Sequence, residues 1–174
     1  MRAQLYSLRE LPAGCISMMA RPRGGDWLLD EVTALREAGV HVLVSLLTPL
    51  EIDEFELAEE SAFCKTQDIT FFSFPIIDRS VPPLNDRTLA LIQLLDDQRV
   101  QGKHIALHCR QGLGRAALMA ASLLVLSGWS PDGKSPTKWT DLARKRGTLP
   151  SILDTGTNFS RKAAPHLASF IDVL

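Results

Sequence analysis

The residues best suited to chemistry lie in one short segment, HCRQGLGRA, which runs from His108 to Ala116. A cysteine reacts as its thiolate, which a helix N-terminus or a neighbouring cation stabilises. If the segment turns from a strand into a helix that begins near Gly114, its backbone N–H groups converge on one small hollow. Arg115 adds a planar fork that binds two oxygens of one phosphate. The segment therefore predicts a binding site for a tetrahedral dianion beside a nucleophilic Cys109.

The other residues of this segment also have expected tasks. Two glycines, Gly112 and Gly114, give the loop the backbone freedom to curl. The N–H groups of residues 110–115 are expected to cradle the substrate, so the substrate-binding residues are Arg110, Gln111, Gly112, Leu113 and Gly114. His108 is expected to hydrogen-bond the loop backbone and keep the thiolate charged, and an ordinary strand-end histidine is the alternative. For Cys109 the alternative is a buried, inert residue beside a glycine turn.

The spacing H-C-x5-R, formed by His108, Cys109 and Arg115, resembles the signature loop of the cysteine-dependent protein tyrosine and dual-specificity phosphatases. The similarity extends over about residues 10 to 150 and is to small, atypical dual-specificity enzymes, including kinase-associated phosphatase. The stretches GLGRA and FPIIDRSVPP are also similar to the phosphatases of regenerating liver. The resemblance implies that the cysteine attacks phosphorus, that water then releases phosphate from a phosphocysteine, and that no metal or cofactor takes part.

The resemblance also implies a general acid. In such enzymes an aspartate on a mobile loop protonates the leaving oxygen and later helps to activate water. The matching residue is Asp78, in the loop that follows the strand expected over 71–76. Prolines on both sides would stiffen the ends of this lid, namely Pro75, Pro82 and Pro83. A turn or N-cap aspartate is the alternative, and Asp86 is a weaker candidate because Asn85-Asp86 is typical of a helix start.

The position directly after the arginine departs from the family pattern. Most such enzymes have serine or threonine there, whose hydroxyl stabilises the departing thiolate when the phosphocysteine breaks down, whereas this chain has Ala116. The departure concerns turnover rather than phosphate binding. We therefore expect slow hydrolysis of the intermediate, with a burst of product followed by a weak steady state.

Strand-like and helix-like segments alternate along the chain. The expected strands are 5–8, 16–20, 41–47, 71–76 and 104–108, and the expected helices run from Asp26 to Gly39, from a capping box at Thr48 to about Lys65, from about Asp86 to Gly102 and from 115 to 127. This alternation predicts a three-layer α/β domain with a mostly parallel central sheet flanked by helices. The resemblance implies that it is the protein tyrosine phosphatase-like fold.

The tail carries weaker signals. From Thr148 onward the sequence is compatible with a final helix. Residues 144–146 are basic and are expected on the solvated face of a late helix. Asn158 is the candidate for holding the hydrolytic water, as a residue of this type does in many relatives.

Composition limits the classes of protein that remain. Of the 174 residues, 45% are hydrophobic and 22% are charged, and the net charge is −1. A chain of this length can bury its own core, so we expect a single phosphatase domain over residues 1–174. The near-neutral charge gives no general basic field, so nucleic acid is not an expected partner. No apolar stretch reaches the roughly 20 residues that a membrane span needs, and no membrane partner is expected.

Cysteine usage favours a reducing compartment. The three cysteines, Cys15, Cys64 and Cys109, form no C-x-x-C pair, and the start of the chain does not read as a secretory signal. We therefore expect a cytoplasmic protein, and a monomer. Cys15 and Cys64 are expected in the core, and a redox disulfide between either of them and Cys109 is an open alternative.

Other charged residues have less specific expectations. Arg21 and Arg23 lie in a Gly/Pro loop after a strand, where they either approach the mouth of the site or are solvated. Arg110 favours polyanionic substrates or is a solvated rim residue. The acidic segment from Glu51 to Glu60 lacks histidine and is expected to be a solvated surface rather than a metal site.

The function that these residues predict is a phosphoprotein phosphatase. It would act on phosphotyrosine, and on phosphoserine or phosphothreonine if the pocket is shallow, with a phosphocysteine intermediate and with Cys109, Arg115 and Asp78 as the catalytic residues. Two alternatives stay open. One is a phosphate-recognition module with little turnover, which Ala116 favours, and the other is a sulfurtransferase, in which Asp78 would have no acid role.

Overall fold

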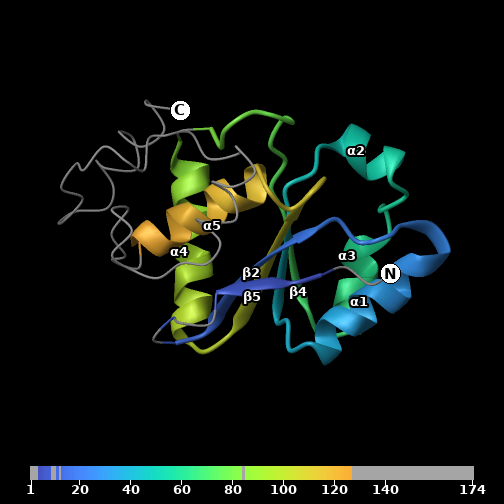
Figure 1. Cartoon of the computed structure of the whole chain (residues 1–174), viewed down its shortest axis with the longest axis horizontal. Helices are drawn as coiled ribbons and strands as arrows, with labels where there is room; N and C mark the ends of the chain where they lie inside the picture. The colour runs from blue at the N-terminus through green and yellow to red at the C-terminus, as the bar shows by residue number, and fades with distance from the viewer. Residues whose placement is uncertain (1–3, 9–10, 12, 84, 127–174) are drawn as a thin grey trace.

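The computed structural model describes residues 4–8, 11, 13–83 and 85–126. A five-stranded sheet with the order β1-β2-β5-β3-β4 lies at its centre (Figure 1). β1 pairs with β2 antiparallel, whereas the β2–β5, β5–β3 and β3–β4 pairs are parallel. The strands are Tyr6–Leu8 (β1), Cys15–Ala20 (β2), Val42–Ser45 (β3), Thr70–Ser73 (β4) and His104–Cys109 (β5). The mostly parallel sheet predicted from the sequence is confirmed.

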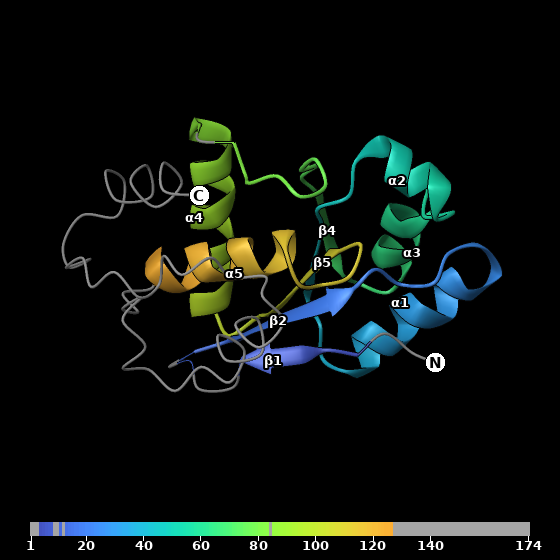
Figure 2. The same ribbon diagram turned by 45° about the horizontal axis from the view of Figure 1, so that its top comes forward.

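Helices cover both faces of this sheet. α4 and α5 lie on one side and α1 and α3 on the other, as Figures 1 and 2 show from two directions. Parallel strands need such crossover helices, which leave the sheet buried on both faces. The helices are α1 (Leu28–Glu37, after a 3-10 turn at Gly25–Trp27), α2 (Pro49–Glu54), α3 (Glu60–Thr66), α4 (Asp86–Val100) and α5 (Arg115–Leu126).

The two apolar cores follow the alternation of side chains along the strands. In β3, Val42 and Val44 pack into the core under α4 and α5, while Leu43 packs into the core on the α1 and α3 side. β5 repeats the pattern, because Leu107 belongs to the first core and Ala106 to the second. Consecutive side chains of β5 consequently point to opposite faces of the sheet.

The expected single acidic helix from Thr48 to about Lys65 is wrong. It is divided into α2 and α3, because Glu56 adopts φ 54°, in the left-handed region. The break turns Leu57 into the core, where it is 1% exposed. At the same break, the backbone carbonyl of Glu56 accepts a 3.0 Å hydrogen bond from the N–H of Gly25. Burial of a leucine and a tertiary hydrogen bond outweigh the local helical preference.

Two further sequence expectations have defined outcomes. The strand expected over 71–76 ends at Ser73, although Phe74 N–H still donates to the Ser45 carbonyl at 2.8 Å. No helix among the described residues is long and apolar enough to cross a membrane. The expectations for residues 144–146, Asn158 and a final helix fall outside the described residues, and the single-domain assignment stays a prediction.

Candidate active site

The segment from His108 to Ala116 runs from a strand through a loop into a helix, as predicted. Cys109 ends β5 and Arg115 begins α5. Gly112 requires glycine, because its φ is 76° and an added Cβ would lie 2.4 Å from the Met19 carbonyl carbon. Gly114 does not: its φ is not in the left-handed region, and nothing lies within 4 Å of an added Cβ. The loop is therefore pressed against the end of β2 at Gly112 and is open at Gly114.

The loop presents unused backbone donors. Among the described residues, no N–H group of residues 110–114 donates a hydrogen bond to a protein group. A run of successive backbone donors without protein acceptors is typical of an anion-binding loop. A pocket of about 690 Å³ lies over this loop and is lined by the lid residues Asp78, Arg79, Ser80 and Val81, and by Cys109, Arg110, Gln111, Leu113, Gly114, Arg115 and Leu118.

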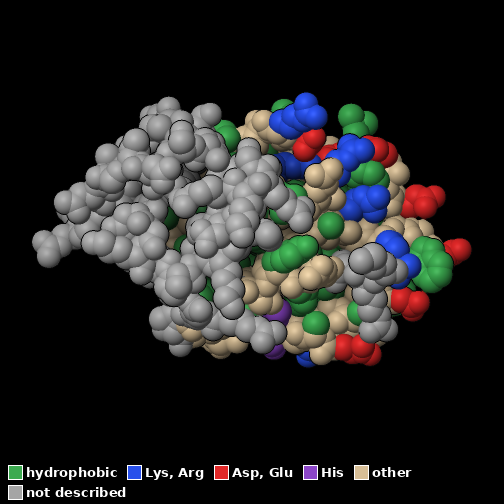
Figure 3. Space-filling view, viewed as in Figure 1, with side chains coloured by type: hydrophobic (Ala, Val, Ile, Leu, Met, Phe, Trp, Pro, Cys, Tyr) green, Lys and Arg blue, Asp and Glu red, His purple; other side chains and the backbone are tan. Residues whose placement is uncertain are grey.

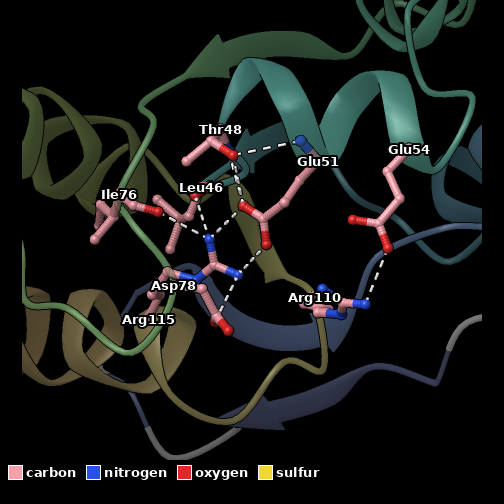
Figure 4. Close-up of polar contacts among 8 residues, drawn as sticks. All are labelled: Leu46, Thr48, Glu51, Glu54, Ile76, Asp78, Arg110 and Arg115. Atoms are coloured by element: carbon pink, nitrogen blue, oxygen red, sulfur yellow. Dashed lines mark hydrogen bonds and ion pairs between the residues drawn. The ribbon is translucent and has the colours of Figure 1, made fainter.

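Arg115 is held in position by four hydrogen bonds to three groups (Figure 4). Its two terminal nitrogens donate to the two carboxylate oxygens of Glu51, each at 2.7 Å. Nη1 also donates to the backbone carbonyls of Leu46 at 3.3 Å and Ile76 at 2.8 Å. The arginine is 3% exposed. A bidentate ion pair together with two carbonyl acceptors fixes the guanidinium plane beside Cys109.

Glu51 is the functional residue that sequence reasoning missed. Its side chain completes the capping box of α2, because Thr48 N–H and Oγ1 both donate to Oε2, at 2.9 and 3.0 Å. Hydrogen bonds from Arg115 lower the pKa of Glu51 from 4.5 to about 2, although burial acts in the opposite direction. The same pairing raises the pKa of Arg115. The only signal in the sequence was the capping box, which predicts a helix start and says nothing of a distant arginine.

The solvated surface expected from Glu51 to Glu60 is accordingly wrong at both ends. Glu51 is 7% exposed and Glu60 is 2% exposed. Glu51 turns inward toward Arg115 at the start of α5, and Glu60 turns inward toward His108 in β5. A run of acidic residues could not show this, because the turn at Glu56 decides which side of each short helix faces the sheet.

Asp78 lies where the resemblance placed it, in the lid over the pocket. Its Oδ1 is 3.1 Å from Arg115 Nη2, and its side chain is 51% exposed. The next residue, Arg79, has φ 59°, and Ser80 N–H closes the turn by donating to the Ile77 carbonyl at 3.0 Å. The weaker rival Asp86 is the first residue of α4, which Asn85 caps, and it does not line the pocket.

His108 does not make the contact with the loop backbone that the sequence predicted. Its side chain is fully buried on the opposite face of β5 from Cys109, with Nε2 3.1 Å from Glu60 Oε1. Neither ring nitrogen makes a hydrogen bond of good geometry within the described residues, so the expected bond to the loop backbone is absent. His108 and Gly112 also do not line the pocket, unlike the other loop residues predicted to bind substrate.

The remaining cysteines lie away from Cys109. Cys15 pairs in register with His104, at the far end of β5, so it is about 16 Å from Cys109 along the strands. Cys64 is fully buried in the core of the other face, and burial, with the charge of Glu60, raises its pKa to about 12. No disulfide forms among the described residues, and a bridge requires Cα atoms closer than about 7 Å. Cys64 is a core residue, as predicted, whereas Cys15 is only half-buried.

Helix α2 contacts both arginines of the loop. Glu51 pairs with Arg115, and one turn later Glu54 Oε1 accepts a hydrogen bond from Arg110 Nη2 at 3.0 Å (Figure 4). Residues three apart on a helix share a face, so one short helix places two carboxylates over the loop. Arg110 lines the rim of the pocket with its side chain 45% exposed.

Known proteins share this fold. A family model described as "Polymorphic toxin system, DSP-PTPase phosphatase" matches residues 17–129. Kinase-associated phosphatase, solved with its catalytic-site cysteine replaced by serine, has a TM-score of 0.74 and 18% identity, covering 99% of this chain and 96% of that chain. A putative protein tyrosine phosphatase from Leishmania major has a TM-score of 0.57 and 20% identity, covering 98% and 97%.

A third solved structure, PTPMT1 in complex with PI(5)P, has a TM-score of 0.59 and 17% identity, and covers 91% of this chain and 90% of that chain. No curated protein matches the chain. At these identities the solved structures show a shared fold, and that fold is the phosphatase-like α/β domain predicted from the sequence. The family model covers more than half of the chain, and the chain therefore belongs to the DSP-PTPase phosphatase family of polymorphic toxin systems, within the dual-specificity phosphatase superfamily.

Proposed function

We propose that this chain hydrolyses phosphomonoesters of phosphoproteins, on phosphotyrosine and also on phosphoserine or phosphothreonine, through a phosphocysteine at Cys109. The observation that carries the proposal is the loop beside this cysteine, in which the N–H groups of residues 110–114 have no protein acceptor. Such donors stabilise the equatorial oxygens of a transferring phosphoryl group without rearranging during the reaction. No cofactor is needed for this chemistry.

The reaction has two steps. In the first, the Cys109 thiolate attacks phosphorus, the bond from phosphorus to the ester oxygen breaks, and Asp78 gives its proton to that oxygen. In the second, water attacks phosphorus, the phosphorus–sulfur bond breaks with the electron pair returning to sulfur, and the Asp78 carboxylate takes the proton of the water. Positioning and charge stabilisation supply most of the rate.

The contact between Asp78 and Arg115 fits the acid role. The arginine is anchored by Glu51, so its position does not depend on the lid. A phosphate dianion that approaches Arg115 Nη2 competes with the Asp78 carboxylate, which is 3.1 Å from the same nitrogen. Two anions on one donor repel each other, which favours the protonated form of the aspartate when substrate is bound. Asp78 would thus take up its proton from solvent as the substrate binds.

The fold neighbours support the assignment of the nucleophile. Kinase-associated phosphatase has a catalytic-site cysteine, which its solved form carries as serine. Here Cys109 is the cysteine that lines the pocket, next to Arg115. Cys109 also lies at the carboxyl end of a parallel strand, before a helix, and ligands bind at that end of the strands in open α/β sheets.

Hydrolysis of an aryl phosphate by wild type, Cys109→Ser and Asp78→Asn tests the proposal. We expect Cys109→Ser to lose all activity above background. Asp78→Asn should lose about 10²-fold to 10⁴-fold on esters with poor leaving groups and much less on an activated aryl phosphate, because only poor leaving groups need the acid. Retained turnover in Cys109→Ser would exclude the covalent mechanism.

Ala116 favours a second candidate function, phosphate recognition with little turnover. This residue is fully buried at the start of α5, so the departing sulfur has no hydroxyl there to stabilise it. We expect a burst of product and then a slow steady state in wild type, and a faster steady state in Ala116→Ser. The matched control is Ala117→Ser, at a buried neighbouring position. If Ala116→Ser leaves the steady-state rate unchanged, the missing hydroxyl is not what limits turnover.

A further inference from the structure

Two large apolar side chains are exposed next to the residues that contact Arg115. Leu50, in α2, is 82% exposed, and Ile77, which leads into the lid, is 73% exposed. No other large apolar side chain among the described residues is exposed as much, and Leu46 and Leu47, just before α2, are fully buried. Single exposed apolar residues are common, whereas apolar side chains that gather beside a pocket are typical of a binding surface.

Both side chains are tied to the pocket through the same guanidinium. Leu50 immediately precedes Glu51, and Ile77 immediately precedes Asp78. Glu51 Oε1 lies 2.7 Å and Asp78 Oδ1 lies 3.1 Å from the same atom, Arg115 Nη2. Neither Leu50 nor Ile77 lines the pocket itself. They therefore form an apolar pair outside the pocket, at its rim.

The lid carries apolar side chains both inside the pocket and outside it. Val81 lines the pocket, and it lies in the same segment as Ile77, four residues later. An aliphatic wall suits the carbon skeleton of a phosphorylated side chain whose phosphate reaches the loop. Consecutive Cα atoms are about 3.8 Å apart, so the neighbours of the bound phosphorylated residue lie at the mouth of the pocket, close to the apolar pair.

The charges near Leu50 limit what can bind there. Asp53 and Glu54 follow Leu50 by three and four residues in α2, and both are exposed. Residues at these spacings share a helix face, so an acidic substrate residue beside Leu50 would meet charges of its own sign. An apolar residue meets no such repulsion. In Figure 3, hydrophobic side chains reach the surface at the end of the molecule where α2 lies, among acidic and basic ones.

We propose that Leu50 and Ile77 determine substrate preference by binding an apolar side chain next to the phosphorylated residue. The substrate class is a phosphoprotein segment in which apolar rather than acidic residues flank the phosphate. This inference rests on the proposed function and adds its sequence preference. Contact between apolar side chains removes both from water and so favours binding. Because Ile77 directly precedes Asp78, the same contact would hold the lid over the substrate.

Binding of peptides to the Cys109→Ser background measures the preference without turnover. Three phosphotyrosine peptides differ only in the two residues that flank the phosphotyrosine, which are leucine, serine or glutamate. Calorimetry gives the three affinities. We expect the leucine peptide to bind about threefold to tenfold more tightly than the serine peptide, and the glutamate peptide to bind most weakly. Leu50→Gln and Ile77→Gln should each lower the leucine-to-serine ratio, and the double variant should bring it to about one.

Val100→Gln is the matched control, because Val100 is also an exposed apolar residue, at the end of α4. It should leave the ratio unchanged. A ratio that the double variant keeps would overturn the proposal, and so would tightest binding of the glutamate peptide or binding of no peptide. Self-association that the double variant abolishes, measured by ultracentrifugation, would assign the apolar pair to a second copy of the chain instead. Wild-type hydrolysis of the serine peptide tests the proposed function separately, because that peptide lacks the apolar flanking residues.

Discussion

Two acidic residues from neighbouring helices pair with two basic residues on either side of Cys109, His108 in β5 and Arg115 at the start of α5, and the two pairs differ in quality. At the pocket, Glu51 and Arg115 share two hydrogen bonds of 2.7 Å, and two carbonyls accept further bonds from the arginine. Behind the strand, Glu60 and His108 make one contact of 3.1 Å. Among the described residues, every buried side-chain nitrogen or oxygen without a hydrogen-bond partner belongs to three residues of this second region, Ser45, Glu60 and His108.

The region around Glu51 and Arg115 is well paired and forms the candidate site, whereas the region around Glu60 and His108 is less well paired and packs behind it. Buried polar groups stabilise a protein when all their donors and acceptors are satisfied, and incompletely paired groups cost free energy. The guanidinium that would bind phosphate is therefore the rigid partner. His108, which precedes Cys109, lies in a polar cluster whose donors and acceptors are not all paired. We expect substitutions in the two regions to have unequal consequences.

The largest effect is expected from Glu51→Gln. The substitution leaves Arg115 buried without its counter-charge, which typically costs about 3 to 5 kcal/mol of unfolding free energy. The guanidinium would also lose its orientation, so kcat on an aryl phosphate should fall. Denaturant unfolding and steady-state kinetics measure the two effects. The control is Glu59→Gln, an exposed carboxylate in the same acidic segment. Near-normal stability and kcat in Glu51→Gln would show that the loop positions Arg115 without help.

A pH dependence follows from the same pair. The pKa of Glu51 is about 2 in the folded protein against an ordinary value of 4.5, so its ionised form is favoured by folding. The stabilisation is complete above pH 4.5 and is lost as the pH falls through 2. We expect the stability difference between wild type and Glu51→Gln to shrink by about 3 kcal/mol between pH 5 and 2. A difference that is constant over this range would mean that Glu51 is not preferentially ionised in the folded state.

A smaller effect is expected from Glu60→Gln. An amide of the same shape can still contact His108 Nε2, and the pair that it replaces is poorly hydrogen-bonded, so the loss of stability should be about 1 to 3 kcal/mol. Because this region lies behind the strand, kcat should change less than in Glu51→Gln. Thermal or denaturant unfolding, with kinetics on the same samples, compares the two variants. Equal losses of kcat in Glu51→Gln and Glu60→Gln would show that the two regions do not differ in their importance for catalysis.

The smallest effect is expected from chemical modification of the native thiols, which changes no residue of the sequence. Burial raises the pKa of Cys64 to about 12, whereas Cys109 lines the pocket. Iodoacetamide at pH 8 should therefore modify Cys109 and leave Cys64 intact until the protein unfolds, as peptide mass spectrometry would show. Inorganic phosphate should protect Cys109 by occupying the loop. Rapid modification of Cys64 in the native protein would mean that the region behind β5 opens readily.

Several features could be predicted because they are local. The strand, the glycine loop and the helix around Cys109 are contiguous in sequence, so residue type and spacing were enough to place Cys109 and Arg115 at the two ends of one loop. The alternation of strands and helices predicted a mostly parallel sheet in the same way. Asn85 was also identified as a helix start, since an N-cap needs only the residues that follow it.

The partners of these residues were decided by tertiary structure alone. Glu51 and Glu60 lie in an acidic run that looked solvated, but the left-handed residue Glu56 divides the run into two helices, and both carboxylates are buried. Arg21 and Arg110 are 89 residues apart in the sequence, and only the parallel register of β2 and β5 brings them to the ring of Phe55. The sequence by itself determines features that depend on residues close together in the chain. Charge pairs between distant segments depend on the tertiary structure, because only the crossover connections of the fold bring those segments together.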